Sequence, residues 1–333
     1  MLSKNLLTTC IGATLAVLAG CHAAGDAPGG DVPADAAGAG DAADAAVAGD
    51  LGAPADLASA ADLATALLYD DDGPEPYTTM QMTASGNGKS IPITVYVPST
   101  AGARPLVVVS AGLQQPGAAY APYARRLASW GIIAVTRDDP GVLAQAPAVA
   151  DDIAFVVGWL PTALPGRVDA GKLGLAGHSR GGMASLLAAE GALHGKLAGF
   201  FGLDPVDSNG AAAMSLGALA IPSVFLGETT DAAGSMACAP ADQNYDVLWH
   251  AAPSPSLELT AVGADHTEFE DPASCAFCTL CTKGSADAAV VLRYSTRYLM
   301  RFFARTLLAD PRIDATLNSA ADVAAGLVQL QSK

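Results

Sequence analysis

The sequence predicts an α/β domain whose central, mostly parallel sheet carries helices on both faces. Short apolar runs rich in β-branched residues, such as RPLVVVSAG (104–112) and IIAVT (132–136), are typical of strands buried on both sides. A segment with helical periodicity, AYAPYARRLASWG (119–131), separates these two runs. Strands that alternate with helices in this way form a doubly wound parallel sheet.

The same alternation continues along the chain. Further strands are expected at 91–98, 172–177, 197–204, 221–228 and 256–263. Further helices are expected at 148–160, 182–193 and 287–308. Hydrophobic residues make up 51% of the 333 residues, enough for one large buried core.

The net charge of −16 is unevenly distributed. Residues 22–72 contain eleven Asp and no Lys or Arg, whereas 73–333 contain 22 acidic and 16 basic residues. The acidic stretch is nearly all Ala, Gly, Asp and Pro, a composition that buries too little apolar area to fold. We therefore expect a disordered tether at 21–73 and a folded domain at 74–333. Clustered basic residues are lacking, so nucleic acid is not an expected partner.

The first 21 residues have the pattern of an export signal. Lys4 is followed by an apolar stretch and then by small residues, in a segment too short to span a bilayer. The final Leu-Ala-Gly-Cys (18–21) resembles the bacterial lipobox, which implies cleavage after residue 20 and lipidation of Cys21. His22 stands where an Asp would favour the inner membrane. The expectation is an outer-membrane lipid anchor, with a plain secretory signal as the alternative.

The segment GLAGHSRGGMAS (174–185) contains a G-x-S-x-G motif centred on Ser179. Glycine is common in this chain, so the motif alone is weak. Its context is specific, because it lies between a predicted strand and a predicted helix, as a nucleophile elbow does. Gly177 and Gly181 suit a turn too sharp for side chains at those positions. Ser179 is therefore the candidate nucleophile.

A serine nucleophile needs a histidine base and an acid that orients it. His266 follows the last predicted strand, where this architecture places the base. Asp204 and Asp231 each end a strand between Ser179 and His266, so chain order permits either as the acid. Asp265 and Glu228 are weaker rivals. The remaining histidines are expected to have no catalytic role: His22, His178, His194 and His250.

These motifs support a family resemblance. GHSRGG (177–182) and GLDPVD (202–207) resemble segments of the chlorophyllases, as do CAP (238–240) and GADHTEFEDP (263–272). The histidine segment and the Ser–Asp spacing are also similar to those of the platelet-activating-factor acetylhydrolases. The resemblance covers about 90–310 and implies an α/β-hydrolase fold.

The resemblance also implies roles for particular residues. Both families take their acid from the position of Asp204, whereas a similarity to cutinase-like polyester hydrolases would assign that role to Asp231. The backbone N–H groups of Arg180 and Leu113 are expected to form the oxyanion hole. Gly112 would allow close approach of the backbone. Ala111 departs from the chlorophyllases, which have His there.

Six cysteines are present. Cys10 belongs to the export signal and Cys21 to the lipid anchor. The other four could hold zinc, but an exported protein meets an oxidising compartment, which favours two disulfides. These four candidates are Cys238, Cys275, Cys278 and Cys281.

The sequence thus predicts a lipid-anchored serine hydrolase that cleaves carboxylic esters without a cofactor or a metal. Its substrate is a small-molecule or polymeric ester, and the loops 138–147 and 206–217 are expected to line an apolar pocket. A polyester hydrolase that uses Asp231 is one alternative. A second is a non-catalytic, surface-tethered binding protein with a hydrolase-like fold, and a third is a metal-binding surface protein built around residues 275–281.

Overall fold

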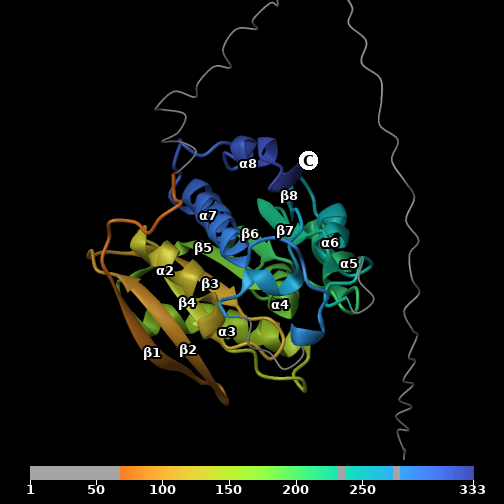
Figure 1. Cartoon of the computed structure of the whole chain (residues 1–333). Coiled ribbons are helices and arrows are strands. Elements are labelled where there is room, and N and C mark those ends of the chain that lie inside the picture. Colours follow the sequence, from red (N-terminus) through yellow and green to blue (C-terminus); the bar gives the residue numbers. More distant parts are fainter. Residues whose placement is uncertain (1–67, 232–236, 273–277) are drawn as a thin grey trace, which may run out of the picture. The chain divides into compact units, whose positions relative to one another are not determined.

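The computed structural model describes residues 68–231, 237–272 and 278–333, which belong to one compact unit (Figure 1). The expected export signal, Cys21, most of the expected tether and Cys275 lie outside the described residues. Within the described ranges, no helix combines the length and apolarity needed to cross a bilayer.

A nine-stranded sheet forms the centre of the unit. Its order is β1-β2-β4-β3-β5-β6-β7-β8-β9, with β3 to β8 parallel and with β1, β2 and β9 antiparallel to their neighbours. The strands are β1 (Tyr77–Gly86), β2 (Lys89–Pro98), β3 (Arg104–Ser110), β4 (Ile133–Arg137), β5 (Val168–His178), β6 (Leu197–Leu203), β7 (Ser223–Glu228), β8 (Ser256–Ala261) and β9 (Val328–Ser332).

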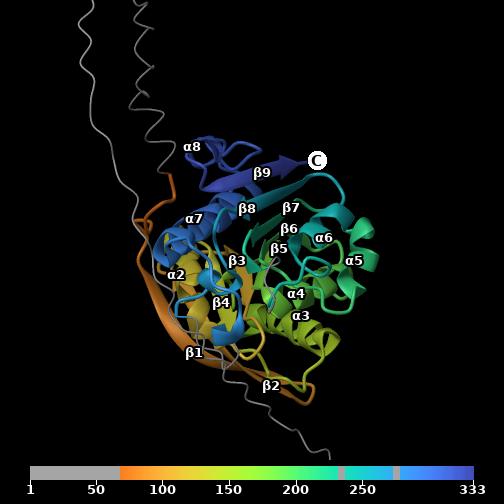
Figure 2. The ribbon, with the colours of Figure 1, turned by 45° about the vertical axis from the view of Figure 1, so that its right-hand side comes forward.

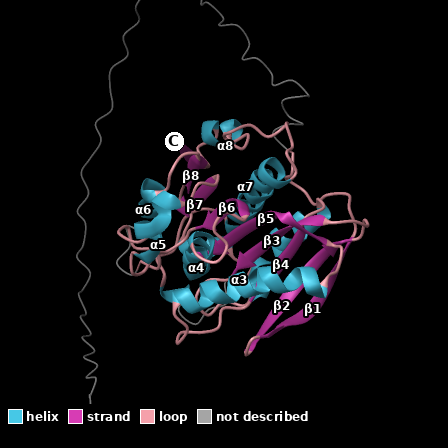
Figure 3. Cartoon of the chain, turned by 180° about the vertical axis from the view of Figure 1, so that it is seen from behind, coloured by secondary structure: helices cyan, strands magenta, loops and turns pink. Residues whose placement is uncertain are grey.

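Helices cover both faces of this sheet (Figures 1 and 3). The helices are α2 (Ala121–Ser129), α3 (Ala146–Ala163), α4 (Ser179–Glu190), α5 (Ala211–Ser215), α6 (Tyr245–Ala251), α7 (Ala288–Leu307) and α8 (Ala320–Ala324). Side chains of α2 and α7 pack in one hydrophobic cluster, and those of α3, α4, α5 and α6 pack in the other.

Strand β3 shows why the sheet is buried on both sides. Val107 and Val109 contribute to the cluster of α2 and α7, while Leu106 and Val108 contribute to the cluster of α3 and α4. Successive side chains of a strand point to opposite faces, so a continuous apolar run needs a helical layer on each side. The expected alternation of strands and helices is therefore present.

The strand order places the loops that carry the candidate site residues at one edge of the sheet. Strand β3 lies between β4 and β5, so the chain leaves β3 on one side and returns on the other. Ser110 at the end of β3 is the register partner of Gly177, and Leu203 at the end of β6 is the partner of His178. Loops that follow parallel strands at such a switch point form the usual ligand crevice.

Two features differ from the sequence-based expectation. The antiparallel edge strands β1 and β9 were not expected (Figure 2). Strand β1 is polar and largely exposed, with a period-2 pattern in which Met80 and Met82 pack towards the core. Residues 68–73 belong to the folded unit rather than to the tether. Tyr69 is buried against Trp130, and Asp70 pairs with Arg297 of α7.

Candidate active site

Ser179 occupies the sharp corner between β5 and α4. Its φ is 52°, in the left-handed region that residues other than glycine rarely adopt. A Cβ atom on Gly177 would lie 2.4 Å from the carbonyl oxygen of Gly181, and one on Gly181 would lie 2.4 Å from that of Ser110. Both positions therefore require glycine. The turn holds Ser179 in a strained conformation at the first residue of a twelve-residue helix.

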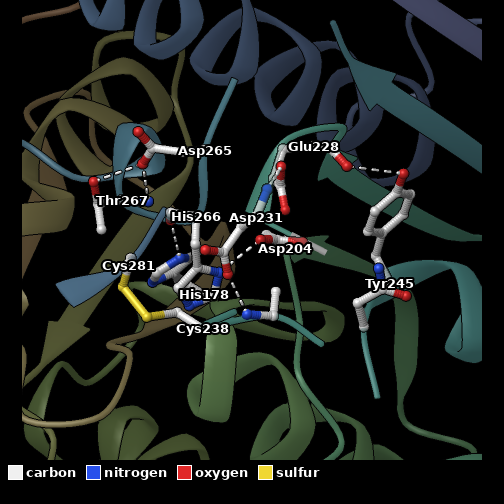
Figure 4. Close-up of polar contacts among 12 residues, drawn as sticks. His178, Asp204, Glu228, Asp231, Cys238, Tyr245, Asp265, His266, Thr267 and Cys281 are labelled. Carbon is white, nitrogen blue, oxygen red and sulfur yellow. Dashed lines mark hydrogen bonds and ion pairs between the residues drawn. A yellow bond between two sulfur atoms is a disulfide. The ribbon is translucent and has the colours of Figure 1, made fainter. Parts of the chain in front are cut away.

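Asp204 and His266 meet beside this corner. Asp204 follows β6, and His266 begins a short 3-10 helix (His266–Phe269) after β8. His266 Nδ1 lies 2.6 Å from Asp204 Oδ2, and both side chains are buried (Figure 4). The structure thus brings one predicted acid into hydrogen-bond contact with the predicted base.

Asp231, the alternative acid, has other partners. Its Oδ2 accepts a hydrogen bond from the Ala239 N–H at 2.6 Å, and its Oδ1 accepts one from the Thr282 N–H at 3.0 Å. Glu228 accepts from the backbone N–H groups of Thr230 and Asp231, which shapes the turn after β7. Both oxygens of Asp231 therefore serve backbone amides rather than a histidine ring.

Burial controls the protonation of the acid–base pair. It lowers the pKa of His266, because the imidazolium loses its water, although several nearby carboxylates, Glu270 first among them, oppose this change. Burial likewise raises the pKa of Asp204, to about 8. Burial therefore opposes a separate charge on either side chain, and a 2.6 Å hydrogen bond joins the two.

Asp265 anchors the segment that carries His266. Its carboxylate caps the 3-10 helix by accepting a hydrogen bond from the Thr267 N–H, and the Glu268 carboxylate accepts one from the Asp265 N–H. The other oxygen of Asp265 accepts from the Gly284 N–H at 2.9 Å. Asp265 therefore fixes the backbone next to His266. Among the hydrogen bonds of the described residues, none joins Asp265 to the His266 ring.

The loop after β3 and the first turn of α4 place backbone N–H groups near Ser179. A Cβ atom on Gly112 would lie 3.3 Å from the Cβ of Ser179, so the loop after β3 passes directly beside that residue. Leu113 follows Gly112, and within the described ranges its N–H donates to no protein acceptor. Arg180 lies in the first turn of α4, where amides lack intrahelical partners. These are the two amides that the sequence analysis named.

A buried polar network beneath these loops was not predicted from the sequence. His178 Nε2 donates to the carbonyl oxygen of His266 at 2.9 Å, and its Nδ1 lies 2.8 Å from the Tyr120 hydroxyl and 3.0 Å from Glu270 Oε1. The same hydroxyl accepts from the Gly112 N–H at 3.0 Å. Its pKa lies well above the usual value, first because of burial and then because of Glu270. The network connects the loop after β3, the elbow and the base segment.

Two members of this network lie within motifs of the sequence: His178 within GHSRGG and Glu270 within GADHTEFEDP. The spacing of these motifs does not show which residue the His178 side chain contacts. Tyr120 lies in a helical segment with no motif. His194 and His250, for which no catalytic role was expected, are both exposed.

Cys238 and Cys281 form a disulfide across 43 residues (Figure 4). Two of the four candidate cysteines are thus paired with each other, so a zinc site made of all four thiolates is excluded. Cys275 lies outside the described residues, and the pairing of Cys278 is not described. Asp231 supports the bridge, because the residues it binds, Ala239 and Thr282, directly follow the two half-cystines. Among the described residues, no group of three His, Cys, Asp or Glu is placed to hold a metal ion.

The chain was compared with known protein families and with curated proteins. The family model described as Chlorophyllase matches residues 71–314, which include every described site residue named above. No curated protein matches the chain.

Proposed function

Because the chain belongs to the chlorophyllase family, whose members are α/β-hydrolases acting on esters, we propose that it cleaves carboxylic esters through a Ser179–His266–Asp204 triad. Family membership confirms the α/β-hydrolase fold. The proposed triad is supported above all by the 2.6 Å hydrogen bond between His266 and Asp204, beside a serine held at φ 52°.

In the proposed first step, Ser179 Oγ attacks the ester carbonyl while His266 Nε2 removes its proton. Asp204 fixes the ring by accepting from Nδ1, which leaves Nε2 as the basic nitrogen. The imidazolium that forms is stabilised by the Asp204 carboxylate, and it then donates its new proton to the leaving alcohol. Ser179 remains acylated.

The negative charge of the tetrahedral intermediate falls on the former carbonyl oxygen. The N–H groups of Leu113 and Arg180 are the proposed donors to this oxygen. Arg180 is the second residue of α4, whose N-terminal dipole favours a developing anion. Gly112 supports this geometry, since a side chain there would collide with His178 Nδ1 at 2.8 Å.

Water then releases the acyl group. His266 deprotonates the water, which attacks the acyl carbonyl, and the proton passes to Ser179 as the carboxylic acid leaves. These steps use the side chains of the chain and water, so the proposal assigns no role to a cofactor.

We further propose that the hydrolase works outside the cytoplasm on a lipid anchor at Cys21. The export-signal pattern before residue 21 and the acidic, Gly-rich and Ala-rich segment after it support this location. Mass spectrometry of the protein isolated from the membrane fraction of its source would show a lipidated N-terminal Cys21. An unmodified peptide that contains residues 15–25 would contradict the proposal.

Replacement of the nucleophile tests the proposed activity. Ser179→Ala should lower kcat for p-nitrophenyl acetate by about 10⁴-fold or more, because no other group replaces the attacking oxygen. Ser90→Ala is a matched control, since Ser90 is exposed at the end of the β1–β2 hairpin. Both variants should keep the native circular dichroism spectrum. Wild-type turnover by folded Ser179→Ala would refute the mechanism.

A further inference from the structure

Large aliphatic side chains are exposed on loops around the proposed active site. Leu113 is 40% exposed, Val142 is 54%, Leu143 is 91% and Leu280 is 50%. We call these four residues the apolar rim. Exposed apolar groups that gather at one place mark an interaction surface more often than isolated ones do.

The loop that carries Val142 and Leu143 is bound to the nucleophile elbow. The Arg180 guanidinium donates to the carbonyl oxygens of Gly141 and Ala144, at 3.0 and 2.9 Å, on either side of these two residues. Arg180 directly follows Ser179 in the chain. The two most exposed rim side chains are therefore fixed on a loop that contacts the elbow.

A buried carboxylate joins this loop to the loop of Leu113. Asp139 Oδ1 accepts from the N–H groups of Gln114 and Gly141, at 3.0 and 2.8 Å, and its Oδ2 accepts from Arg180 Nε at 3.0 Å. The Asp139 side chain is 1% exposed. Gln114 follows Leu113, and Gly141 precedes Val142, so one side chain fixes both parts of the rim relative to each other.

Leu280 lies on the side of the base. It precedes Cys281 of the disulfide, and the Thr282 N–H after it binds Asp231. Two residues later, the Gly284 N–H binds Asp265, the neighbour of His266. The apolar rim thus combines residues from the loop of Leu113, from the loop that the Arg180 side chain binds, and from the segment that anchors His266.

The charges around the rim restrict what it can bind. The cations on these loops are engaged: Arg180 binds Asp139 and two carbonyls, and Lys283 donates to the Thr267 hydroxyl at 2.6 Å. Residues 73–333 contain 22 acidic and 16 basic residues, so the folded part of the chain is negatively charged. An anionic surface would therefore meet repulsion, and on the described rim loops it would find no cation without a protein partner.

The chemistry of the exposed groups is aliphatic. Every large hydrophobic side chain exposed in the described part of the chain is Leu, Val or Met. Aromatic side chains, which would stack on an aromatic polymer, are absent from that set. Leu and Val instead suit contact with aliphatic acyl chains.

We propose that the apolar rim docks the protein onto the surface of an aggregated, uncharged aliphatic ester, such as emulsified triacylglycerol, so that the substrate reaches Ser179 from an interface. The substrate class rests on the proposed esterase function, whereas docking is measurable without turnover. In solution, the rim exposes apolar area to water. Docking buries this area at the ester surface, and its removal from water supplies the binding energy.

Adsorption to an emulsion of tributyrin tests the docking. The full chain is used with Ser179→Ala, which prevents hydrolysis, and bound protein is measured by flotation. Adding Val142→Ser/Leu143→Ser should lower the partition constant by about tenfold or more, since burial of one such side chain is worth that factor. The matched control, Val323→Ser/Leu327→Ser, changes the same two residue types at 41% and 38% exposure near the β9 edge. It should leave adsorption unchanged.

Kinetics with an active serine test the substrate class. The rate on tributyrin should rise steeply above its solubility limit, and Val142→Ser/Leu143→Ser should remove this rise, whereas Val323→Ser/Leu327→Ser should keep it. The docking proposal is overturned if the rim and control variants adsorb equally, or if aromatic polyester particles or anionic vesicles bind better than the emulsion. Absence of p-nitrophenyl acetate hydrolysis in a wild type that adsorbs would instead refute the proposed esterase function.

Discussion

At the scale of single residues, the two candidate acids differ by what their oxygens bind. Both follow neighbouring strands and both are fully buried, so position and burial do not separate them. Asp204 contacts the His266 ring, whereas Asp231 binds the amides that follow Cys238 and Cys281. Asp204 is therefore the proposed catalytic acid, whereas Asp231 holds the disulfide region.

Replacing each acid by its amide should separate these roles. Asp204→Asn should lower kcat for p-nitrophenyl acetate by about 10³–10⁴-fold, because an amide neither fixes the productive tautomer nor stabilises the imidazolium. Asp231→Asn should change kcat less than about tenfold and lower the free energy of unfolding by about 1–3 kcal/mol, through loss of one amide partner. A large loss of kcat in Asp231→Asn with a nearly silent Asp204→Asn would reverse the assignment.

The pH profile reports the state of His266. The base acts only when neutral, and burial lowers its pKa from the ordinary value of 6.5. As pH falls, activity should therefore persist until below pH 6.5 before the ring is protonated. The acid limb of kcat/KM for p-nitrophenyl acetate, measured on enzyme that stays folded, should have its midpoint below pH 6.5. A midpoint above that value would show that the neighbouring carboxylates outweigh burial.

At the scale of elements, the elbow depends on two glycines that bring β5, α4 and the end of β3 into close contact. The sequence predicted this junction because a buried strand, a G-x-S-x-G motif and a helix follow one another. The sequence did not predict the conformation of Ser179 or which atoms would collide with a Cβ on Gly177 or Gly181. Both depend on how β3 packs against β5.

Gly177→Ala should disrupt the junction. Its Cβ would lie 2.4 Å from a backbone oxygen that cannot move freely, which should cost about 1–3 kcal/mol of unfolding free energy and much of the activity. Gly158→Ala is the control, because a Cβ there has open space in α3 and should stabilise the helix by about 0.5–1 kcal/mol. Urea unfolding compares the two variants. Equal stability for both would contradict the crowding at the elbow.

At the scale of the whole molecule, the parallel centre of the sheet was predictable and its edges were not. Runs such as Leu106–Val109 predict buried strands, because a short, β-branched stretch that is apolar at every position suits a strand covered on both sides. β1 and β9 are polar edge strands, so their composition does not identify them as strands. They are recognised by their pairing with β2 and β8. The sequence did not predict that the folded unit includes Tyr69 and Asp70, because an acidic segment is expected to be exposed to solvent. The arginines that bind Asp70, Arg293 and Arg297, lie 223 and 227 residues further along the chain.

The site was predictable to a similar degree. Ser179, His266 and the choice between two acids follow from motifs and chain order, while the selection of Asp204 in the structure depends on which loop reaches the ring. The Tyr120–His178–Glu270 network and the Asp139–Arg180 link depend on long-range packing, which no local spacing encodes. Polar networks assembled from distant segments are the part of a site that a single sequence reveals least.

The central claim is that Ser179 is an activated nucleophile. Its most direct test is reaction of the folded protein with a fluorophosphonate probe, followed by mass spectrometry of the peptides. The account predicts one adduct, on Ser179, that is lost when the protein is unfolded or when His266 is replaced by Ala. An unlabelled folded protein, or an adduct on a different serine, would contradict it.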